Sequence, residues 1–211
     1  MDLTHNFTVP VPVADAWKIL TDVERIAPCL PGAELQEIEG DVFRGVVKVK
    51  VGPIAAQFKG QASFQERDDV NHKAVLKGEG RDTGGKGNAA ALITAQLTAL
   101  SANETQCQVD TDLQITGKVA QFGRGAMKDI SDKLLGQFVD NLNELIASQK
   151  DAPATQEPAP AAAPSDGGVR KVEGPEAKPI DLLDAAGAPI LKRALPVLVV
   201  IAAVVVWLIV K

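Results

Sequence analysis

The residues of this chain whose types could do catalytic or metal-binding chemistry fall into no recognisable constellation. The two histidines, His5 and His72, belong to no set of His, Cys or carboxylate side chains at metal-ligand spacing. His5 falls in an alternating segment and His72 in a turn, and we expect both to be satisfied or solvated. Ser63, Ser101 and Ser131 lie in no nucleophile motif. The sequence therefore predicts a protein that is not an enzyme and that holds no metal.

A glycine-rich stretch, Asp82–Asn88, resembles a phosphate-binding loop only superficially. It lacks the G-x-x-x-x-G-K-[ST] spacing and falls between two strand-like runs rather than before a helix. We therefore interpret it as a hairpin loop. The carboxylates of Asp68, Asp69, Asp110 and Asp112 are most simply interpreted as solvated.

Charge and cysteine content exclude further classes of protein. The formal net charge is −5 and the Lys and Arg residues are scattered, which argues against a nucleic-acid partner. Cys29 and Cys107 are far apart and match no C-x-x-C or zinc spacing; we expect Cys107 to point inward as a small apolar residue. Residues 1–12 carry no secretory signal pattern, so the folded part is expected in the cytoplasm.

Hydrophobic periodicity predicts one α+β domain over residues 1–149. A strand at 3–9 precedes two short helices at 13–20 and 23–27. Period-two alternation then predicts strands at 33–39, 43–51, 54–64, 74–81, 89–99 and 107–115. Their short connections indicate a curved antiparallel sheet with one wet and one dry face. The run 117–149 has apolar residues three or four apart, and we expect one long helix covering the dry face.

Many positions on the dry face are small. They are Ala56, Ala62, Ala74, Gly78, Gly80, Ala89, Ala91, Ala95 and Ala99. Because protein interiors are close-packed, such a face either lets the helix approach closely or leaves a hollow. Phe58, Phe64, Phe122 and Phe138 could fill the space, so the pattern alone leaves both interpretations open.

The composition changes sharply after the predicted domain. Residues 150–179 are rich in Ala, Pro, Glu and Gly and almost lack large apolar side chains, which predicts a disordered linker. Residues 180–193 form a juxtamembrane segment whose composition fits a short interfacial helix and a plain spacer equally.

The run 194–210 contains no charged or polar side chain apart from the indole of Trp207. As a helix it would be about 25 Å long, which predicts a C-terminal transmembrane anchor. Trp207 suits an interfacial position, and Lys211 follows the run. Lys192 and Arg193 flank its near side, which by the positive-inside rule places the domain at the cytoplasmic face of the cell membrane.

Several motifs resemble one known family, that of the G subunit of carbon monoxide dehydrogenase, a bacterial START-like (SRPBCC) family. They are Val13-x-x-Ala16-Trp17-x-x-Leu20-x-Asp22, Cys29-Leu30-Pro31-Gly32-Ala33, Val51-Gly52-Pro53-Ile54 with Phe58-x-Gly60, Gly117-Lys118-x-Ala120-x-Phe122-Gly123, and Gln137-Phe138-x-x-Asn141-Leu142. The resemblance covers residues 2–147. It departs at Gln137, where many members carry a second aromatic residue.

The resemblance implies the helix-grip fold of the polyketide cyclase and lipid-transport superfamily, with a hydrophobic cavity between helix and sheet. It implies an accessory subunit of a molybdenum-containing dehydrogenase, not the catalyst. The expected cavity residues are Ile19, Leu20, Val23, Ile26, Leu30, Val49, Val51, Phe58, Phe64, Leu76, Ile93, Leu97, Phe122, Met127, Ile130, Leu134 and Phe138. We expect the mouth near residues 22–31.

Cavity, linker and anchor together suggest a function. A respiratory isoprenoid quinone such as menaquinone, confined to the bilayer, would be carried to the dehydrogenase and accept its electrons for the respiratory chain. The alternatives are membrane docking of the dehydrogenase without ligand carriage, and carriage of a phospholipid. A cyclase or hydrolase activity is disfavoured, because the chain has no Tyr and no convergent acid–base pair.

Overall fold

The structure is a computed structural model, and it describes residues 1–51, 54–150, 169–172 and 180–181. Nearly all secondary structure expected in the domain is present. In chain order the elements are β1 (Asp2–Val9), α1 (Val13–Thr21), α2 (Val23–Ile26), a 3₁₀ turn (Ala27–Cys29), β2 (Ala33–Glu39), β3 (Val42–Val51), β4 (Ile54–Asp68), β5 (Lys73–Asp82), β6 (Asn88–Ser101), β7 (Glu104–Ile115), a second 3₁₀ turn (Gly117–Phe122), α3 (Gly123–Lys150), β8 (Arg170–Lys171) and β9 (Ile180–Asp181).

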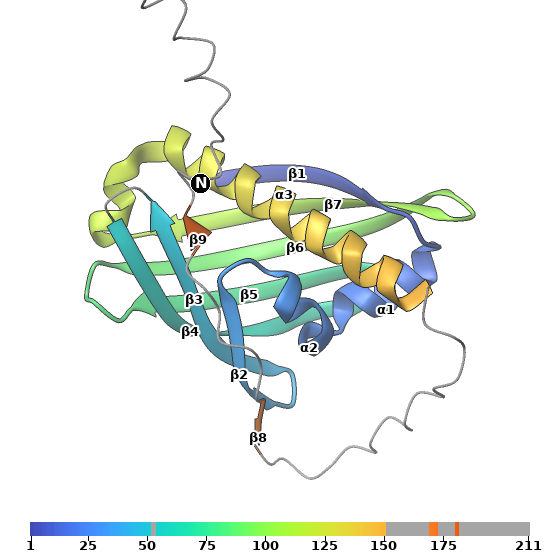
Figure 1. The fold of residues 1–211 in the computed structure, drawn as a ribbon, viewed down its shortest axis with the longest axis horizontal. Helices are drawn as coiled ribbons and strands as arrows, with labels where there is room; N and C mark the ends of the chain where they lie inside the picture. The colour runs from blue at the N-terminus through green and yellow to red at the C-terminus, as the bar shows by residue number, and fades with distance from the viewer. Residues whose placement is uncertain (52–53, 151–168, 173–179, 182–211) are drawn as a thin grey trace, which may run out of the picture.

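The strands form one curved sheet in the order β1-β7-β6-β5-β4-β3-β2-β8, with β9 paired to β3. Strands β2 to β7 run as an antiparallel meander, and β1 closes the far edge by pairing with β7. Helix α3 lies diagonally across the concave face, and α1 and α2 lie near its C-terminal end (Figure 1). The α+β architecture predicted from the sequence is confirmed.

Two glycines, Gly45 and Gly60, mark a close approach of neighbouring strands. Gly45, Gly60 and Gly80 lie in register across β3, β4 and β5. A Cβ added at Gly60 would lie 1.9 Å from the carbonyl oxygen of Glu79, and one at Gly45 would lie 2.3 Å from that of Glu34. Only glycine tolerates such an approach, which allows the sheet to curl around α3.

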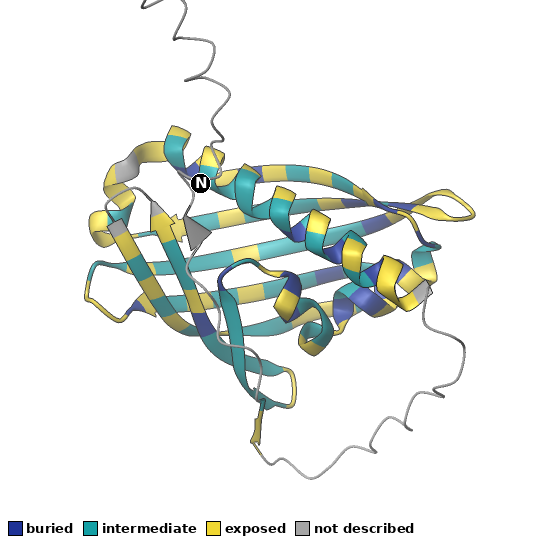
Figure 2. Ribbon diagram, in the orientation of Figure 1, coloured by how far each residue is buried: buried dark blue, intermediate teal, exposed yellow. Residues whose placement is uncertain are grey.

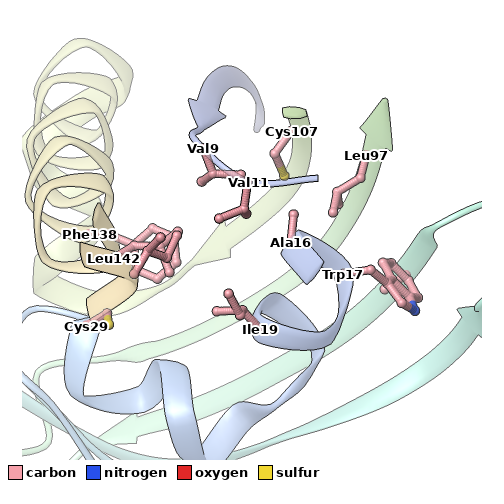
Figure 3. Packing of buried hydrophobic residues seen from close by; sticks show 12 residues of the cluster. Val9, Val11, Ala16, Trp17, Ile19, Cys29, Leu97, Cys107, Phe138 and Leu142 are labelled. Atoms are coloured by element: carbon pink, nitrogen blue, oxygen red, sulfur yellow. The ribbon is translucent and has the colours of Figure 1, made fainter. Parts of the chain in front are cut away.

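Close packing is concentrated at one end of the molecule. Val9, Val11, Ala16, Trp17, Ile19, Cys29, Leu97, Cys107, Phe138 and Leu142 belong to one buried cluster between α1, the sheet and the C-terminal half of α3 (Figure 3). Phe7 and Phe138 meet edge to face with ring centroids 6.0 Å apart, which joins β1 to α3. Toward the N-terminal half of α3, fewer residues are fully buried (Figure 2).

The start of the long helix differs from expectation. The sequence predicts one helix from Gly117, but residues 117–122 form a 3₁₀ turn and α3 begins at Gly123, where φ is 76°. The reason lies in a loop distant in sequence: a Cβ at Gly117, where φ is 79°, would lie 2.3 Å from the Lys86 carbonyl oxygen. Lys118 donates its amide hydrogen to that same oxygen over 2.6 Å. This contact sets the backbone before the helix.

Within the predicted linker the structure describes residues 150 and 169–172, and the linker as a whole stays a prediction. Arg170 and Lys171 form a strand against β2, and the Val172 amide donates to the Gln36 carbonyl at 2.8 Å. Ile180 and Asp181, the first two residues of the segment expected as an interfacial helix or a plain spacer, pair with β3 as a strand. The rest of that segment, residues 182–193, lies outside the described residues. An edge strand presents unpaired backbone groups that an extended segment can satisfy, whatever its composition.

The predicted transmembrane run 194–210, with its flanking residues Lys192, Arg193, Trp207 and Lys211, lies outside the described residues. None of the helices in the described ranges is both long enough and apolar enough to cross a membrane.

Candidate functional site

A cavity of about 540 Å³ lies between α3 and the concave face of the sheet. Its wall is almost wholly apolar. Most of the predicted cavity residues line it, namely Leu20, Val23, Ile26, Leu30, Val49, Phe58, Phe64, Leu76, Ile93, Leu97, Met127, Ile130, Leu134 and Phe138. Contact of these residues with a ligand stays a prediction.

Three predicted residues stand apart from this wall. Ile19 does not line the cavity; it is buried in the packed cluster beside α1. The side chains of Val51 and Phe122 lie outside the described part of the structure.

The prediction missed the wall that β1 and β7 contribute. Leu3, His5 and Phe7 of β1 and Val109 and Leu113 of β7 line the cavity, with His5 opposite Val109 in the strand register. The alternation along both strands was visible in the sequence. The pairing of the first strand with the last was the missing information, and it brings β1 under α3.

The small residues of the dry face leave a hollow. Ala56, Ala74, Ala89 and Ala95 all line the cavity. Gly78, two residues from the lining Leu76, has no atom within 4 Å of the position its Cβ would occupy. Space in front of these strands therefore comes from residue size, while the large side chains of α1 and α3 fill the opposite end.

Two exposed apolar residues mark the opening of the cavity. Leu30 and Val47 both line it, yet they are 42% and 40% exposed. Leu30 follows the 3₁₀ turn and Val47 lies on β3 opposite Ala33 at the start of β2. Leu30 lies within residues 22–31, where we expect the mouth, and the position of the mouth stays a prediction.

Polar groups in the wall are few and mostly satisfied. The Thr21 hydroxyl donates to the Trp17 carbonyl at 2.7 Å, and the Ser131 hydroxyl donates to the Met127 carbonyl at 2.9 Å. Burial raises the pKa of the Cys107 thiol to about 12, so it stays protonated at neutral pH. Among the described residues that line the cavity there is no Lys, Arg, Asp or Glu.

His5 is the one imidazole in the described wall. Its Nε2 lies 3.0 Å from Oδ1 of Asp132 on α3, and Oδ2 of that carboxylate accepts a hydrogen bond from Lys128 Nζ at 2.6 Å. Hydrogen bonds from Lys128 first, and then from His5, hold the pKa of Asp132 below its usual value. The sequence interpretation of His5 as satisfied is correct for one ring nitrogen and overlooks its place in the cavity.

A second depression, about 700 Å³, lies on the outer face of the sheet. It is more open, and its polar lining includes Arg44, Lys59, Glu79 and Arg81. Although larger, it is an open groove on the wet face rather than an enclosed apolar space, so it is a weaker candidate for a ligand site. Across the described ranges, no three His, Cys, Asp or Glu side chains gather where a metal ion could bind.

Solved structures share this architecture. A conserved protein from Geobacillus kaustophilus matches with a TM-score of 0.65 and 18% identity, covering 71% of this chain and 97% of that one. A START superfamily protein from Mycobacterium smegmatis matches with a TM-score of 0.54 and 12% identity, covering 70% and 98%. The ZhuI aromatase/cyclase of Streptomyces sp. R1128 matches with a TM-score of 0.51 and 14% identity, covering 73% and 96%.

Identities this low establish the START-like fold alone. No match to a curated protein sequence was found. A family profile is more informative, because that of the carbon monoxide dehydrogenase G subunit (CoxG) matches residues 6–147, which span the sheet from β1 and nearly all of α3. The chain therefore belongs to the CoxG family, that of the G subunit of carbon monoxide dehydrogenase.

Proposed function

We propose that this protein is a membrane-anchored accessory subunit that carries an isoprenoid quinone, menaquinone in the first instance, between the bilayer and a molybdenum-containing dehydrogenase of the carbon monoxide dehydrogenase type. It acts as a carrier and not as an enzyme. The single observation that carries the proposal is the apolar cavity of about 540 Å³ under α3. That volume lies within the roughly 300–1,000 Å³ of small-molecule sites.

The chemistry of the wall favours a quinone over a phospholipid. A phosphate headgroup is normally bound by Arg, Lys or clustered backbone amides, and none of the described lining residues is an Arg or a Lys. A quinone presents an uncharged ring and a hydrocarbon tail, and both suit a wall of Leu, Ile, Val and Phe. The mouth beside Leu30 and Val47 gives the tail an apolar exit.

The family supplies the partner in this proposal. Its name associates its members with carbon monoxide dehydrogenase. The apolar run 194–210 would hold the carrier at the membrane where the quinone resides. A tether of this kind raises the effective concentration of the carrier near its source to about millimolar without any new contact. Electrons from the dehydrogenase would then reach the respiratory chain on the carried quinol.

Tryptophan fluorescence provides a direct test. The chain has two tryptophans, and Trp17 lines the cavity, so a Trp207→Phe variant leaves one reporter at the site. We expect menaquinone in vesicles to quench the Trp17 emission of this full-length variant. Native mass spectrometry should show one quinone per chain.

A matched pair of α3 variants controls the experiment. Met127 is buried and lines the cavity, whereas Asp129 is exposed. Met127→Arg places a charge in the apolar space and should abolish quenching, while Asp129→Arg should leave it unchanged. Equal quenching in a folded Met127→Arg variant would overturn the placement of the ligand. Absence of quinone from the parent protein would favour a docking role without carriage.

A further inference from the structure

The wall of the cavity contains one group that is suited to bind a ligand oxygen. His5 lies on β1 between Leu3 and Phe7, both of which line the cavity with it. Its side chain is 15% exposed, so most of the ring is enclosed between the strand and α3. A mostly buried imidazole in a largely apolar wall needs a hydrogen-bonding role to offset its burial.

Asp132 fixes how this ring is used. The carboxylate can only accept hydrogen bonds, and its low pKa keeps it ionised, so Nε2 of His5 must be the protonated nitrogen that donates to it. Lys128 holds the same carboxylate from the preceding turn of α3. The orientation and tautomer of the imidazole are therefore set from the helix side, outside the cavity.

The other ring nitrogen remains available. Within the described part of the chain, Nδ1 of His5 has no hydrogen-bond partner. The hydroxyls of Thr21 and Ser131 already donate to backbone carbonyls, and the Cys107 thiol is a weak donor. Thr111 is the remaining hydroxyl of the described wall, two residues along β7 from Val109, which pairs with His5.

We propose that His5, positioned by Asp132, binds a ring oxygen of the carried molecule and so selects a quinone or its quinol over a plain lipid. The inference rests on the proposed function. With neutral imidazole, Nδ1 is an acceptor for the hydroxyl of a quinol. With imidazolium, Nδ1–H is a donor for the carbonyl of a quinone, and the Asp132 carboxylate balances the charge. The same residue thus serves both redox forms.

Three soluble aromatic compounds test the proposal in the full-length Trp207→Phe protein. Menadione carries quinone carbonyls, 1-naphthol carries a hydroxyl, and 2-methylnaphthalene has no oxygen. Titration of Trp17 emission gives a dissociation constant for each. We expect His5→Leu to weaken binding of at least one oxygenated compound by about 5- to 30-fold relative to the hydrocarbon, the effect of one buried hydrogen bond.

Control variants separate recognition from packing. Phe7→Leu changes the apolar wall beside His5 and should weaken all three compounds to a similar extent. Thr111→Val removes the other hydroxyl of the wall that could bind a ligand oxygen. It should leave the ratios between the three dissociation constants unchanged. A vibrational spectrum should show the C=O or C–O band of the bound oxygenated compound shifted in the parent protein and restored toward its free position in His5→Leu.

The outcomes distinguish the two proposals. Binding of all three compounds with ratios unchanged by His5→Leu overturns the role of His5 and leaves carriage intact. The role of His5 is also overturned if Thr111→Val, and not His5→Leu, removes the preference for the oxygenated compounds over the hydrocarbon. Failure of the parent protein to bind any of the three overturns carriage and, with it, this inference. If His5→Leu does not fold, Asp132→Ala provides the test, because it releases the imidazole. This variant should bind the oxygenated compounds with less preference over the hydrocarbon. An unchanged preference counts against the proposal.

Discussion

Asn141 of α3 donates its side-chain Nδ2–H to the carbonyl oxygen of Cys29 over 3.0 Å. This hydrogen bond joins the long helix to the 3₁₀ turn immediately before Leu30, which stands at the opening of the cavity. The two residues are far apart in sequence, and both fall in motifs that resemble the family. The contact ties one side of the mouth to the helix that forms the roof.

Asn141→Ala should loosen this side of the mouth. The carbonyl of Cys29 loses its side-chain donor, and we expect unfolding free energy to fall by about 1 kcal/mol. Denaturant titration measures that change. Amide hydrogen exchange should increase at residues 27–33 but not in β6 or β7. Exchange rising equally throughout the sheet would mean that the contact supports global stability rather than the mouth.

Gly78→Leu should fill the cavity without harming the fold. No atom lies within 4 Å of the Cβ position at Gly78, and a strand glycine is less favourable than a residue with a side chain. We expect stability to be unchanged or slightly higher. Ligand binding should weaken about 5- to 100-fold, or about 1–3 kcal/mol, because the leucine side chain occupies space that the ligand needs. Thermal unfolding and the Trp17 titration measure the two effects.

Gly60→Leu is the matched comparison on the neighbouring strand. Its Cβ would lie 1.9 Å from the backbone oxygen of Glu79, so the strands must separate. We expect a loss of more than about 3 kcal/mol or failure to fold. If Gly78→Leu were equally disruptive, or if it left ligand binding unchanged, the hollow would not lie where we place it.

Asp82 predicts a specific dependence of stability on pH. Its carboxylate is buried and accepts backbone amide hydrogens of Gln57 at 3.0 Å and Lys86 at 2.8 Å. These hydrogen bonds lower the pKa of Asp82 in the folded protein, and the one from the Lys86 amide contributes most. Because the folded pKa is lower than the unfolded one, this stabilisation is present above about pH 4 and is lost as pH falls through the folded value.

Asp82→Asn should therefore cost about 1–3 kcal/mol at neutral pH and much less in acid. The amide keeps one acceptor oxygen but turns an N–H₂ group toward a backbone donor. Denaturant titrations of both proteins between pH 2 and pH 7 give the difference directly. A difference that stays constant over that range would show that the ionised form of Asp82 contributes nothing beyond its shape.

The sequence predicted local structure better than contacts between distant segments. Alternation along Phe43–Val51 and from Cys107 to Ile115 placed strands correctly, since burial of one face of a sheet imposes period two. The 3₁₀ turn at Gly117 was missed because its cause is the approach of Lys86, a contact that no local pattern encodes. Local sequence patterns report the conformation that a segment prefers by itself, and they carry no information on which distant segment will contact it.

The same limit explains what was predicted of the site. Leu134 and Phe138 follow from helix periodicity, and the small residues of the sheet indicated a hollow without deciding it. The role of His5 depends on Asp132, which reaches it from another element. Strand β8 has no compositional signal, because Arg170 and Lys171 pair through backbone groups that any residue carries.

Arg170 adds a side-chain contact to that backbone pairing. Its guanidinium forms a two-pronged ion pair with the carboxylate of Glu24 on α2, with one N–O distance of 3.3 Å. Both side chains are largely exposed, so we expect little effect on global stability. Glu24→Arg should instead detach β8 from β2, which exposes the Val172 amide that donates to Gln36.

Hydrogen exchange with mass spectrometry measures this detachment in the full chain. We expect faster exchange at residues 170–172 in Glu24→Arg, and recovery of the slow rate in the charge-swapped double variant Glu24→Arg with Arg170→Glu. Lys18→Glu on the nearby helix α1 alters net charge without touching the pair and should leave the rate unchanged. If the double variant exchanges as fast as the single one, the ion pair does not hold β8, and backbone pairing alone accounts for its position.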